Sequence, residues 1–258
     1  MLRERGFTVE LAPHVLNREG YLAGPDAVRL RDLQDALDDP GVDTLWFARG
    51  GYGTTRLLGH LTAEHLSRNS KLLVGFSDAT ALFAWASRLP NARCFYAPSV
   101  QELAREGVCH LPSLWEALRG ETVSIPAEGP AEHAGPFPVA GGCLTICSVS
   151  VGTSWEPEVE GRWLLLEDVG EPLYRIDRML THLAQAGWFK RCAGVLLGGF
   201  TGLGEGETYD GVADRTAHLL PPGTPLLTRL PVGHMKGKHT LPLCGTAAWN
   251  GEALIVEQ

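Results

Sequence analysis

Ser77 has the sequence setting of a serine that could act as a nucleophile. It directly follows an apolar run, residues 71–76, and precedes a helical run, residues 79–87. A sharp turn from a strand into a helix exposes a serine hydroxyl and directs the first N–H groups of the helix toward the group that the hydroxyl attacks. The complete G-x-S-x-G pattern is missing, because Ala79 stands where its last glycine would be. Ser77 therefore either caps the helix or acts as a nucleophile.

A glycine-rich loop, residues 49–53, follows another apolar strand and opens another helical segment. Its glycines let the backbone approach a bound group and donate N–H hydrogen bonds, although neither a P-loop nor a dinucleotide-binding pattern is present. In a parallel sheet this loop and Ser77 both lie at the carboxyl ends of their strands, where ligands bind. The loop is thus either a plain tight turn or part of one site with Ser77.

A nucleophilic serine needs a base, and His234 is the leading candidate among the nine histidines. It lies in a polar, glycine-bearing loop after the apolar run 226–230. His239 shares this loop, but Gly237 between them and the lack of a partnered carboxylate argue against a metal pair. We expect His182 to be a surface or packing residue of a helix.

The base in turn needs a carboxylate to orient it. Glu167 and Asp168 follow the apolar run 164–166, so charge comes abruptly at the end of a buried strand. A buried carboxylate without a partner is costly, so each of these side chains should reach solvent or meet a partner. Glu171 and Asp177 are nearby rivals. Spacing alone leaves the choice among the four open.

The elements that must position these residues alternate between strand and helix in the first half of the chain. Apolar runs predict short strands at residues 7–11, 42–48, 71–76 and 93–97. Leucines at helical spacing predict one helix after Gly24-Pro25-Asp26 and another that carries Leu57, Leu58 and Leu61. This alternation predicts an α/β fold with a parallel sheet that helices cover on both faces.

Prolines and glycines crowd residues 121–141, and we interpret this range as a linker. It divides the chain into two predicted domains, residues 1–120 and 142–258. The elements expected in the second domain are strands at 163–166 and 195–200, a helix over 173–183, and a hairpin with a type I′ turn at Asn250-Gly251.

Composition limits the class of protein. The chain has 258 residues, 44% of them hydrophobic, which is enough for real cores and excludes a disordered chain. No apolar run approaches the ~18–20 residues of a membrane-spanning helix, and no secretory signal is visible. The net charge is −8, whereas a nucleic-acid-binding protein typically carries a basic surface. Cys143 and Cys147 lack histidines at zinc-finger spacing. We therefore expect a cytosolic protein without a metal, nucleic-acid or membrane partner.

Several segments resemble the LD-carboxypeptidase (muramoyltetrapeptide carboxypeptidase) family of serine peptidases. The resemblance runs in the same order along the chain, from about residue 7 to the C-terminus. The segments that carry it are residues 48–53 with 56–58, 75–82, 166–169 with 171–172 and 174–180, 198–200, and 233–234 with 241–243 and 245.

The resemblance implies that Ser77 is the nucleophile, His234 the general base and Glu167 the orienting carboxylate. It implies a Rossmann-like N-terminal domain that carries Ser77, and a β-rich α/β C-terminal domain that carries the other two. Similar enzymes take their oxyanion donors from regions that correspond to the Asp78 N–H and the Gly51–Tyr52 loop. A homodimer is implied, and a cofactor is not.

The activity implied is that of a cytosolic carboxypeptidase acting on a small peptide. It would hydrolyse the L,D-amide that holds the terminal D-alanine of cell-wall (murein) tetrapeptides. One alternative is a related peptidase that cleaves a peptidyl- or aminoacyl-nucleotide amide, as in microcin immunity. Another is a non-catalytic protein that binds a small ligand through the glycine loop.

Two features depart from the family pattern. Cys143 follows Gly141-Gly142 at a position where relatives usually carry asparagine. The second departure is at the N-terminus. Residues 1–6 resemble the last turns of a helix that ends at Gly6, and relatives carry a strand and most of that helix before the position of residue 1. We therefore expect the N-terminal sheet to lack its first strand. Such a sheet would be less stable than in relatives, or would pair residues 7–11 differently.

Overall fold

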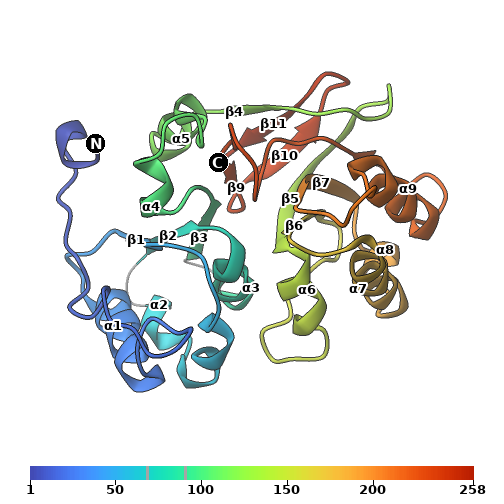
Figure 1. Ribbon diagram of the computed structural model, residues 1–258. Coiled ribbons are helices and arrows are strands. Elements are labelled where there is room, and N and C mark those ends of the chain that lie inside the picture. Colours follow the sequence, from blue (N-terminus) through green and yellow to red (C-terminus); the bar gives the residue numbers. More distant parts are fainter. Residues whose placement is uncertain (68–69, 90–91) are drawn as a thin grey trace.

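The computed structural model describes residues 1–67, 70–89 and 92–258 and has an α/β architecture (Figure 1). Its strands form two sheets, a smaller one of four strands and a larger one of seven. Helices lie between successive parallel strands, as the alternating sequence pattern predicts. The predicted fold class is confirmed.

The smaller sheet has the strand order β1-β2-β3-β9. The first three strands are parallel: β1 (Thr44–Trp46), β2 (Lys71–Gly75) and β3 (Ala92–Tyr96). β9 (Leu241–Pro242) comes from the C-terminal part of the chain and pairs antiparallel with β3. Three of the four strands predicted for the first half are confirmed, and their carboxyl ends meet at one edge.

Helices cover the smaller sheet on two sides in Figure 1, with α1, α2 and α3 on one side and α4 and α5 on the other. Their buried side chains share one hydrophobic core with the strands. The bounds are α1 (Asp26–Asp38), α2 (Glu64–Ser67), α3 (Thr80–Ala86), α4 (Val100–Leu103) and α5 (Leu111–Leu118).

The helix predicted around Leu57 and Leu61 is not an α-helix. Two short 3-10 helices stand there instead, η2 (Thr54–Arg56) and η3 (Leu58–His60). Glycine at position 59 disfavours a continuous helix, and Leu61 is already extended. The leucines are still buried, so the apolar spacing identified the core side chains but not the type of helix.

Residues 7–11, predicted as a strand, form none. Phe7 and Leu11 are 44% and 68% exposed, so the segment buries little apolar surface. An extended segment that joins no sheet gains too little to offset the entropy of ordering it as a strand. Gly6 does end a helical turn, because it follows η1 (Arg3–Arg5) in the left-handed conformation, with φ 87°.

The predicted linker, residues 121–141, contains β4 (Val123–Pro126) and most of β5 (Ala134–Cys143). Pro136 and Pro138 lie in the half of β5 that pairs with β10, and the pairing with β6 begins only at Val139. Their missing N–H groups therefore remove few ladder hydrogen bonds. The proline-rich composition concealed two strands.

The larger sheet has the order β4-β11-β10-β5-β6-β7-β8, with parallel strands from β5 to β8 and antiparallel strands on the other side of β5. Its central strands are apolar because both faces are covered, and Trp163 to Leu166 are fully buried. The remaining strands are β6 (Trp163–Val169), β7 (Gly194–Thr201), β8 (Leu226–Leu227), β10 (Thr246–Trp249) and β11 (Ala253–Glu257).

A second hydrophobic core lies around β6, β7 and the helices beside them. The predicted helix over 173–183 is confirmed, since Ile176, Leu180 and Leu183 are its buried residues. The helices of this part are α6 (Leu144–Ser150), α7 (Leu173–Gln185), α8 (Trp188–Arg191) and α9 (Tyr209–Leu219).

The predicted hairpin is confirmed, because β10 and β11 pair antiparallel. Its turn is not of type I′, which needs a positive φ at both central residues. The central residues are Gly251 and Glu252, since Asn250 N–H bonds to Ala253 O, and Glu252 has no positive φ. Asn250 Oδ1 instead accepts from the N–H groups of Glu252 (3.0 Å) and Ala253 (2.9 Å).

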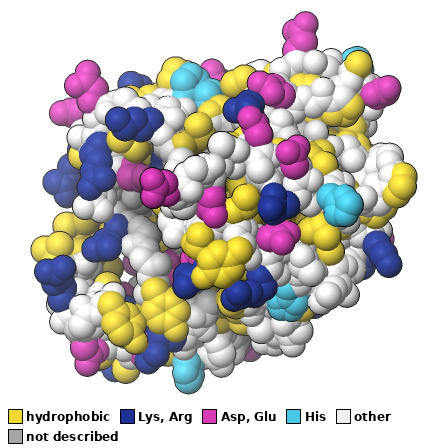
Figure 2. All heavy atoms as spheres, turned by 45° about the vertical axis from the view of Figure 1, so that its right-hand side comes forward, with side chains coloured by type: hydrophobic (Ala, Val, Ile, Leu, Met, Phe, Trp, Pro, Cys, Tyr) yellow, Lys and Arg dark blue, Asp and Glu magenta, His cyan; other side chains and the backbone are white. Residues whose placement is uncertain are grey.

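Figure 2 shows acidic and basic side chains interspersed over one face, with hydrophobic side chains between them. Across residues 1–67, 70–89 and 92–258, every helix is too short or too polar to cross a membrane.

Candidate active site

Ser77 occupies a strained turn at the carboxyl end of β2. It begins the 3-10 helix η4 (Ser77–Ala79), and α3 follows directly. Its φ is 63°, and in the described part of the chain Arg229 is the only other non-glycine residue with a positive φ. Such a conformation costs of order 1–3 kcal/mol and persists where the surroundings impose it, often at active sites. The turn is the strand-to-helix corner predicted from the sequence.

The glycine loop lies against Ser77, as predicted for a shared site. A Cβ built on Gly50 would be 3.3 Å from Ser77 Oγ. Asp78 Oδ2 accepts a hydrogen bond from the N–H of Thr54 (2.8 Å), which ties the end of this loop to the serine turn. The predicted oxyanion donors, at Asp78 and in the Gly51–Tyr52 loop, therefore belong to two segments that are fixed to each other.

Glu167 lies near the carboxyl end of β6, where the pairing with β7 is irregular. The register shifts between Leu166 and Asp168, so Gly198 and Gly199 of β7 lie opposite the single residue Glu167. The extra residue is therefore on β7, and irregularities of this kind are common beside active sites. The Glu167 side chain is fully buried, so its charge must be met by hydrogen bonds from the protein.

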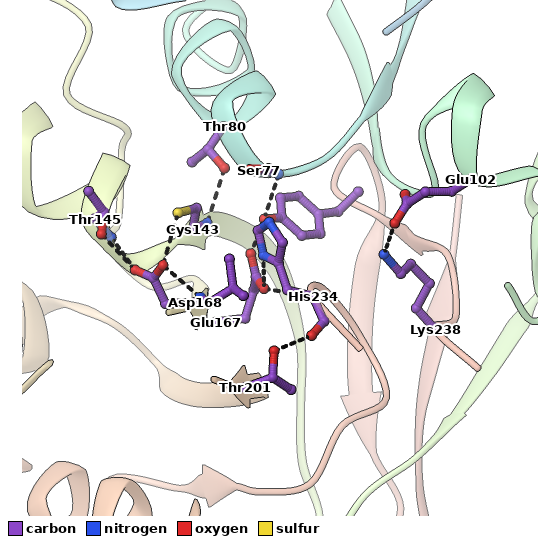
Figure 3. Close-up of polar contacts among 12 residues, drawn as sticks. Ser77, Thr80, Glu102, Cys143, Thr145, Glu167, Asp168, Thr201, His234 and Lys238 are labelled. Carbon is purple, nitrogen blue, oxygen red and sulfur yellow. Dashed lines mark hydrogen bonds and ion pairs between the residues drawn. The ribbon is translucent and has the colours of Figure 1, made fainter. Parts of the chain in front are cut away.

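His234 provides two of these hydrogen bonds. Its Nδ1–H donates to Glu167 Oε2 (2.8 Å), and its backbone N–H donates to the same oxygen (2.7 Å). Thr201 Oγ1 donates to the carbonyl of His234 (2.7 Å), which fixes the loop from the other side. The ring lies beside Phe76, with 4.8 Å between ring centroids, and Figure 3 shows Ser77, Glu167 and His234 converging.

The hydrogen bond at Nδ1 leaves Nε2 of His234 to meet a serine hydroxyl. Among the described residues, no hydrogen bond joins His234 to Ser77 Oγ. Free enzymes often show such contacts long or poorly aligned until substrate binds. The arrangement can extract a proton from a hydroxyl and hold the resulting imidazolium against a buried carboxylate.

Gly233 makes the Glu167–His234 pair sterically possible. A Cβ at this position would lie 2.2 Å from Glu167 Oε2 and 2.4 Å from its Cδ. The residue also has a φ of +97°, a conformation that side-chain-bearing residues rarely adopt. Glycine is therefore required here both for its conformation and for the space it leaves.

The structure separates Glu167 from the other three carboxylates. Asp168 accepts hydrogen bonds from the N–H and the hydroxyl of Thr145 (both 2.8 Å), so it caps the start of α6. Burial raises the pKa of Asp168 above its usual value. Glu171 pairs with Arg175 on the surface (3.5 Å), and Asp177 lies on α7.

The two rival histidines have other partners. His182 contacts Ser148 Oγ (3.2 Å), in agreement with the packing role expected for it. His239 stacks on His110 with 3.9 Å between ring centroids, and its Nδ1 is buried without a hydrogen-bond partner among the described residues. Burial lowers the pKa of His239 from 6.5 to about 4, with a further contribution from His110.

This lowered pKa predicts acid sensitivity of the fold. The unfolded chain binds a proton at His239 more readily, so the contribution of the neutral ring is complete above pH 6.5 and is lost as the pH falls through about 4. His239→Phe should keep the stacking and lose less stability between neutral pH and pH 4, measured by urea midpoints. The exposed His133→Phe serves as control. Equal pH slopes in all three proteins would contradict the prediction.

Tyr96 is a member of this site that the sequence analysis missed. Its hydroxyl accepts a hydrogen bond from the Ser77 N–H (3.1 Å) and donates one to Glu167 Oε1 (2.5 Å). The available signal was its position at the carboxyl end of β3, the same sheet edge that carries Ser77. A tyrosine at the end of an apolar strand is typical of a hydrophobic core, so its position alone does not indicate a role in the site.

Cys143, the departure from the family pattern, lies at the edge of the site. Its N–H donates to Thr80 Oγ1 (3.0 Å) and its thiol lies 3.7 Å from Asp168 Oδ1 (Figure 3). Burial raises the pKa of this thiol well above its usual value. Within the described ranges, no three His, Cys, Asp or Glu side chains are grouped so that they could hold a metal ion.

Comparison with known proteins identifies the family. Residues 1–97 match the LD-carboxypeptidase N-terminal domain, and residues 138–248 match the LD-carboxypeptidase C-terminal domain. A relative from Streptomyces coelicolor, whose name places it among carboxypeptidases, is 38% identical over 92% of this chain and 80% of its own. The murein tetrapeptide carboxypeptidase of Pseudomonas aeruginosa is 31% identical over 98% of this chain and 87% of its own.

A solved structure agrees with these matches. The muramoyltetrapeptide carboxypeptidase of Oxalobacter formigenes superposes with a TM-score of 0.87 at 29% identity, covering 100% of this chain and 91% of that one. The family matches, the identity to relatives and the shared fold lead to one conclusion: this chain belongs to the LD-carboxypeptidase family.

Proposed function

We propose that the protein is a serine-type LD-carboxypeptidase in which Ser77 is the nucleophile, His234 the general base and Glu167 the carboxylate that orients the base. The observation that carries the proposal is the 2.8 Å hydrogen bond from His234 Nδ1 to the fully buried Glu167, beside the turn that holds Ser77. It fixes the ring so that Nε2 is the nitrogen that takes the serine proton.

The chemistry has two halves. Ser77 Oγ attacks the amide carbonyl while His234 Nε2 takes its proton, and the imidazolium formed is stabilised by Glu167. The tetrahedral intermediate then collapses, and His234 returns the proton to the leaving amine. Water, activated by the same base, hydrolyses the acyl-enzyme and restores Ser77.

The developing oxyanion needs donors that are already in place. In this proposal they are the N–H of Asp78, directly after the nucleophile, and an N–H of the Gly51–Tyr52 loop. The contact between Gly50 and Ser77, and the Thr54–Asp78 hydrogen bond, support this assignment because they hold both segments beside the serine. Removing one such donor typically costs ~10²–10³ in turnover.

The proposed substrate is a murein tetrapeptide, from which the enzyme releases the terminal D-alanine. The names of the Pseudomonas and Oxalobacter relatives support this substrate class.

The proposal includes a cytosolic location and a homodimer, for which light scattering should give twice the mass of one chain. Ser77 would belong to a domain over residues 1–120 and the Glu167–His234 pair to one over residues 142–258, so that the reaction takes place between them.

The test is incubation of the purified protein with tetrapeptides that differ only in an L,D or an L,L terminal amide. We expect D-alanine release from the L,D-peptide alone, and labelling of Ser77 by a fluorophosphonate, located by mass spectrometry. Turnover of aminoacyl-nucleotide amides in place of the tetrapeptide would overturn the substrate assignment. Binding of peptide with neither turnover nor labelling would overturn the enzyme assignment in favour of a non-catalytic binder.

A further inference from the structure

The Tyr96 hydroxyl joins the two halves of the site. Tyr96 ends β3 of the smaller sheet and is 1% exposed. Its oxygen lies 3.1 Å from the backbone nitrogen of Ser77 and 2.5 Å from Glu167 Oε1. Glu167 Oε2 in turn holds His234, at 2.8 Å from Nδ1. One hydroxyl therefore lies between the turn that presents the serine and the carboxylate that orients the base.

The direction of each hydrogen bond follows from the chemistry of the groups. An ionised carboxylate only accepts and a backbone N–H only donates, so the single hydroxyl hydrogen of Tyr96 goes to Glu167 and its oxygen accepts from Ser77. Burial, with the nearby Glu167 charge, raises the pKa of Tyr96 well above its usual value. The hydroxyl therefore keeps its hydrogen throughout the pH range in which a peptidase works.

The ring of Tyr96 has little room to move. Phe76 and Phe83 pack against it edge-on, with centroid distances of 6.3 Å and 6.4 Å. On another side it meets the backbone of β5, since a Cβ on Gly142 would lie only 2.7 Å from Tyr96 Cε2. Gly142 has a φ of +146°, so both its conformation and its lack of a side chain make room for the ring.

We propose that Tyr96 is a positioning residue that couples the serine turn to the Glu167–His234 pair. Its oxygen holds the backbone of Ser77 in the left-handed conformation that presents Oγ. Its hydrogen occupies Oε1 of Glu167, so that Oε2 remains for His234. The inference rests on the proposed function, because it assigns a role within the same catalytic site.

The coupling has a consequence for the pH dependence of activity. Tyr96 and protonated His234 compete for the charge of Glu167, so the tyrosine hydrogen bond favours the state in which His234 is neutral and able to act as a base. Without this hydrogen bond the pair should bind its proton more tightly. The acid limb of the activity profile should then move to higher pH.

Other ionisable groups around the pair are the same in every variant used below. They cannot account for a difference between variants. These groups are Cys143 on β5, Asp168 on β6, and Lys238, which lies 4.0 Å from the Phe76 ring centroid and 2.5 Å from Glu102.

The test is Tyr96→Phe, which keeps the ring and removes the hydroxyl. We expect kcat/KM on the L,D-tetrapeptide to fall about 10- to 100-fold, as loss of a hydrogen bond to a charged group predicts. The acid limb of its pH profile should shift upward. The rate at which a fluorophosphonate labels Ser77 should show the same shift, which makes the result independent of the peptide.

Tyr209→Phe is a closely matched control. The Tyr209 hydroxyl accepts from the N–H of Arg229 (2.6 Å), whose φ is 55°, and donates to Leu197 O (3.1 Å). It too accepts from the N–H of a residue with a positive φ, but among the described residues no hydrogen bond joins it to a proposed catalytic group. We expect lower thermal stability with an unchanged acid limb. If Tyr96→Phe behaves in the same way, Tyr96 is merely structural and the inference is overturned.

Site-specific incorporation of difluorotyrosine at position 96 gives a second measurement that does not depend on tolerating phenylalanine. Fluorination makes the hydroxyl a stronger donor, so the acid limb should move to lower pH; no shift would overturn the inference. If the unaltered protein neither turns over peptide nor is labelled, the proposed function fails and the inference fails with it. If the unaltered protein reacts while the acid limb is the same in all variants, only the inference fails.

Discussion

Ser77→Ala is expected to lower kcat on the L,D-tetrapeptide by roughly 10⁴- to 10⁶-fold, the range found when a triad nucleophile is removed. Without Oγ no acyl-enzyme forms, and only binding and the oxyanion donors still favour the reaction. His234→Ala should lose about as much. The Ser77→Ala/His234→Ala double variant should be little worse than either, because the two residues act as a unit. D-alanine release by the three variants and the parent measures this.

The matched control is His182→Ala, since His182 contacts Ser148 on α6 and, within the described residues, forms no hydrogen bond with the proposed catalytic residues. It should retain near-parental turnover. Glu167→Gln should lower kcat by as much as Ser77→Ala and His234→Ala do, or by less. The His234 ring keeps a hydrogen-bond partner at Nδ1 but loses the charge that stabilises the imidazolium. Near-parental turnover in Ser77→Ala would remove the nucleophile assignment.

Gly233→Ala should damage both stability and catalysis. The added methyl group would lie 2.2 Å from Glu167 Oε2, so either the carboxylate or the loop that carries His234 must move. Overpacking and the left-handed conformation together should cost about 2–5 kcal/mol in the free energy of unfolding. A displacement of about 1 Å within the site should lower kcat/KM by ~10² or more. Urea denaturation and steady-state kinetics measure the two effects.

The same loop supplies the control for this prediction. Gly237 also has a positive φ, +67°, but no atom lies within 4 Å of a Cβ built on it. Gly237→Ala should therefore lose only the conformational part, of order 1–2 kcal/mol, and keep its activity. If the two variants lose equal stability and activity, the clash with Glu167 has no role.

The sequence predicted those elements whose signals are local. Apolar runs marked β2, β3, β6 and β7, and the leucine spacing of α7 marked its buried face. Asn250-Gly251 marked the hairpin of β10 and β11. The backbone hydrogen bond from Asn250 to Ala253, however, places Gly251 and Glu252 at the centre of the turn. A strand or helix of this kind depends mostly on neighbours in the chain, which the sequence displays directly.

The errors arose where distant contacts decide the structure. Residues 7–11 have the composition of a strand but pair with no strand in the described part of the chain, and Phe7 and Leu11 stay exposed. Residues 121–141 have the composition of a linker. Strands form there nevertheless, because β4 pairs with β11 and the proline-containing half of β5 pairs with β10. Composition cannot report whether a partner strand exists.

The candidate active site likewise has one part that the sequence predicts and another that depends on distant contacts. The sequence by itself determined the corner at Ser77, because an apolar strand followed at once by a helix leaves few backbone paths between them. Only the tertiary structure decided that Glu167, rather than Asp168, meets His234, 67 residues away, and that Tyr96 meets Glu167, 71 residues away. Glu167 and Asp168 are successive residues of β6 and point to opposite faces of the sheet, so one carboxylate meets His234 while its neighbour caps α6. These choices depend on register and burial between segments that fold together, which spacing along the chain does not contain.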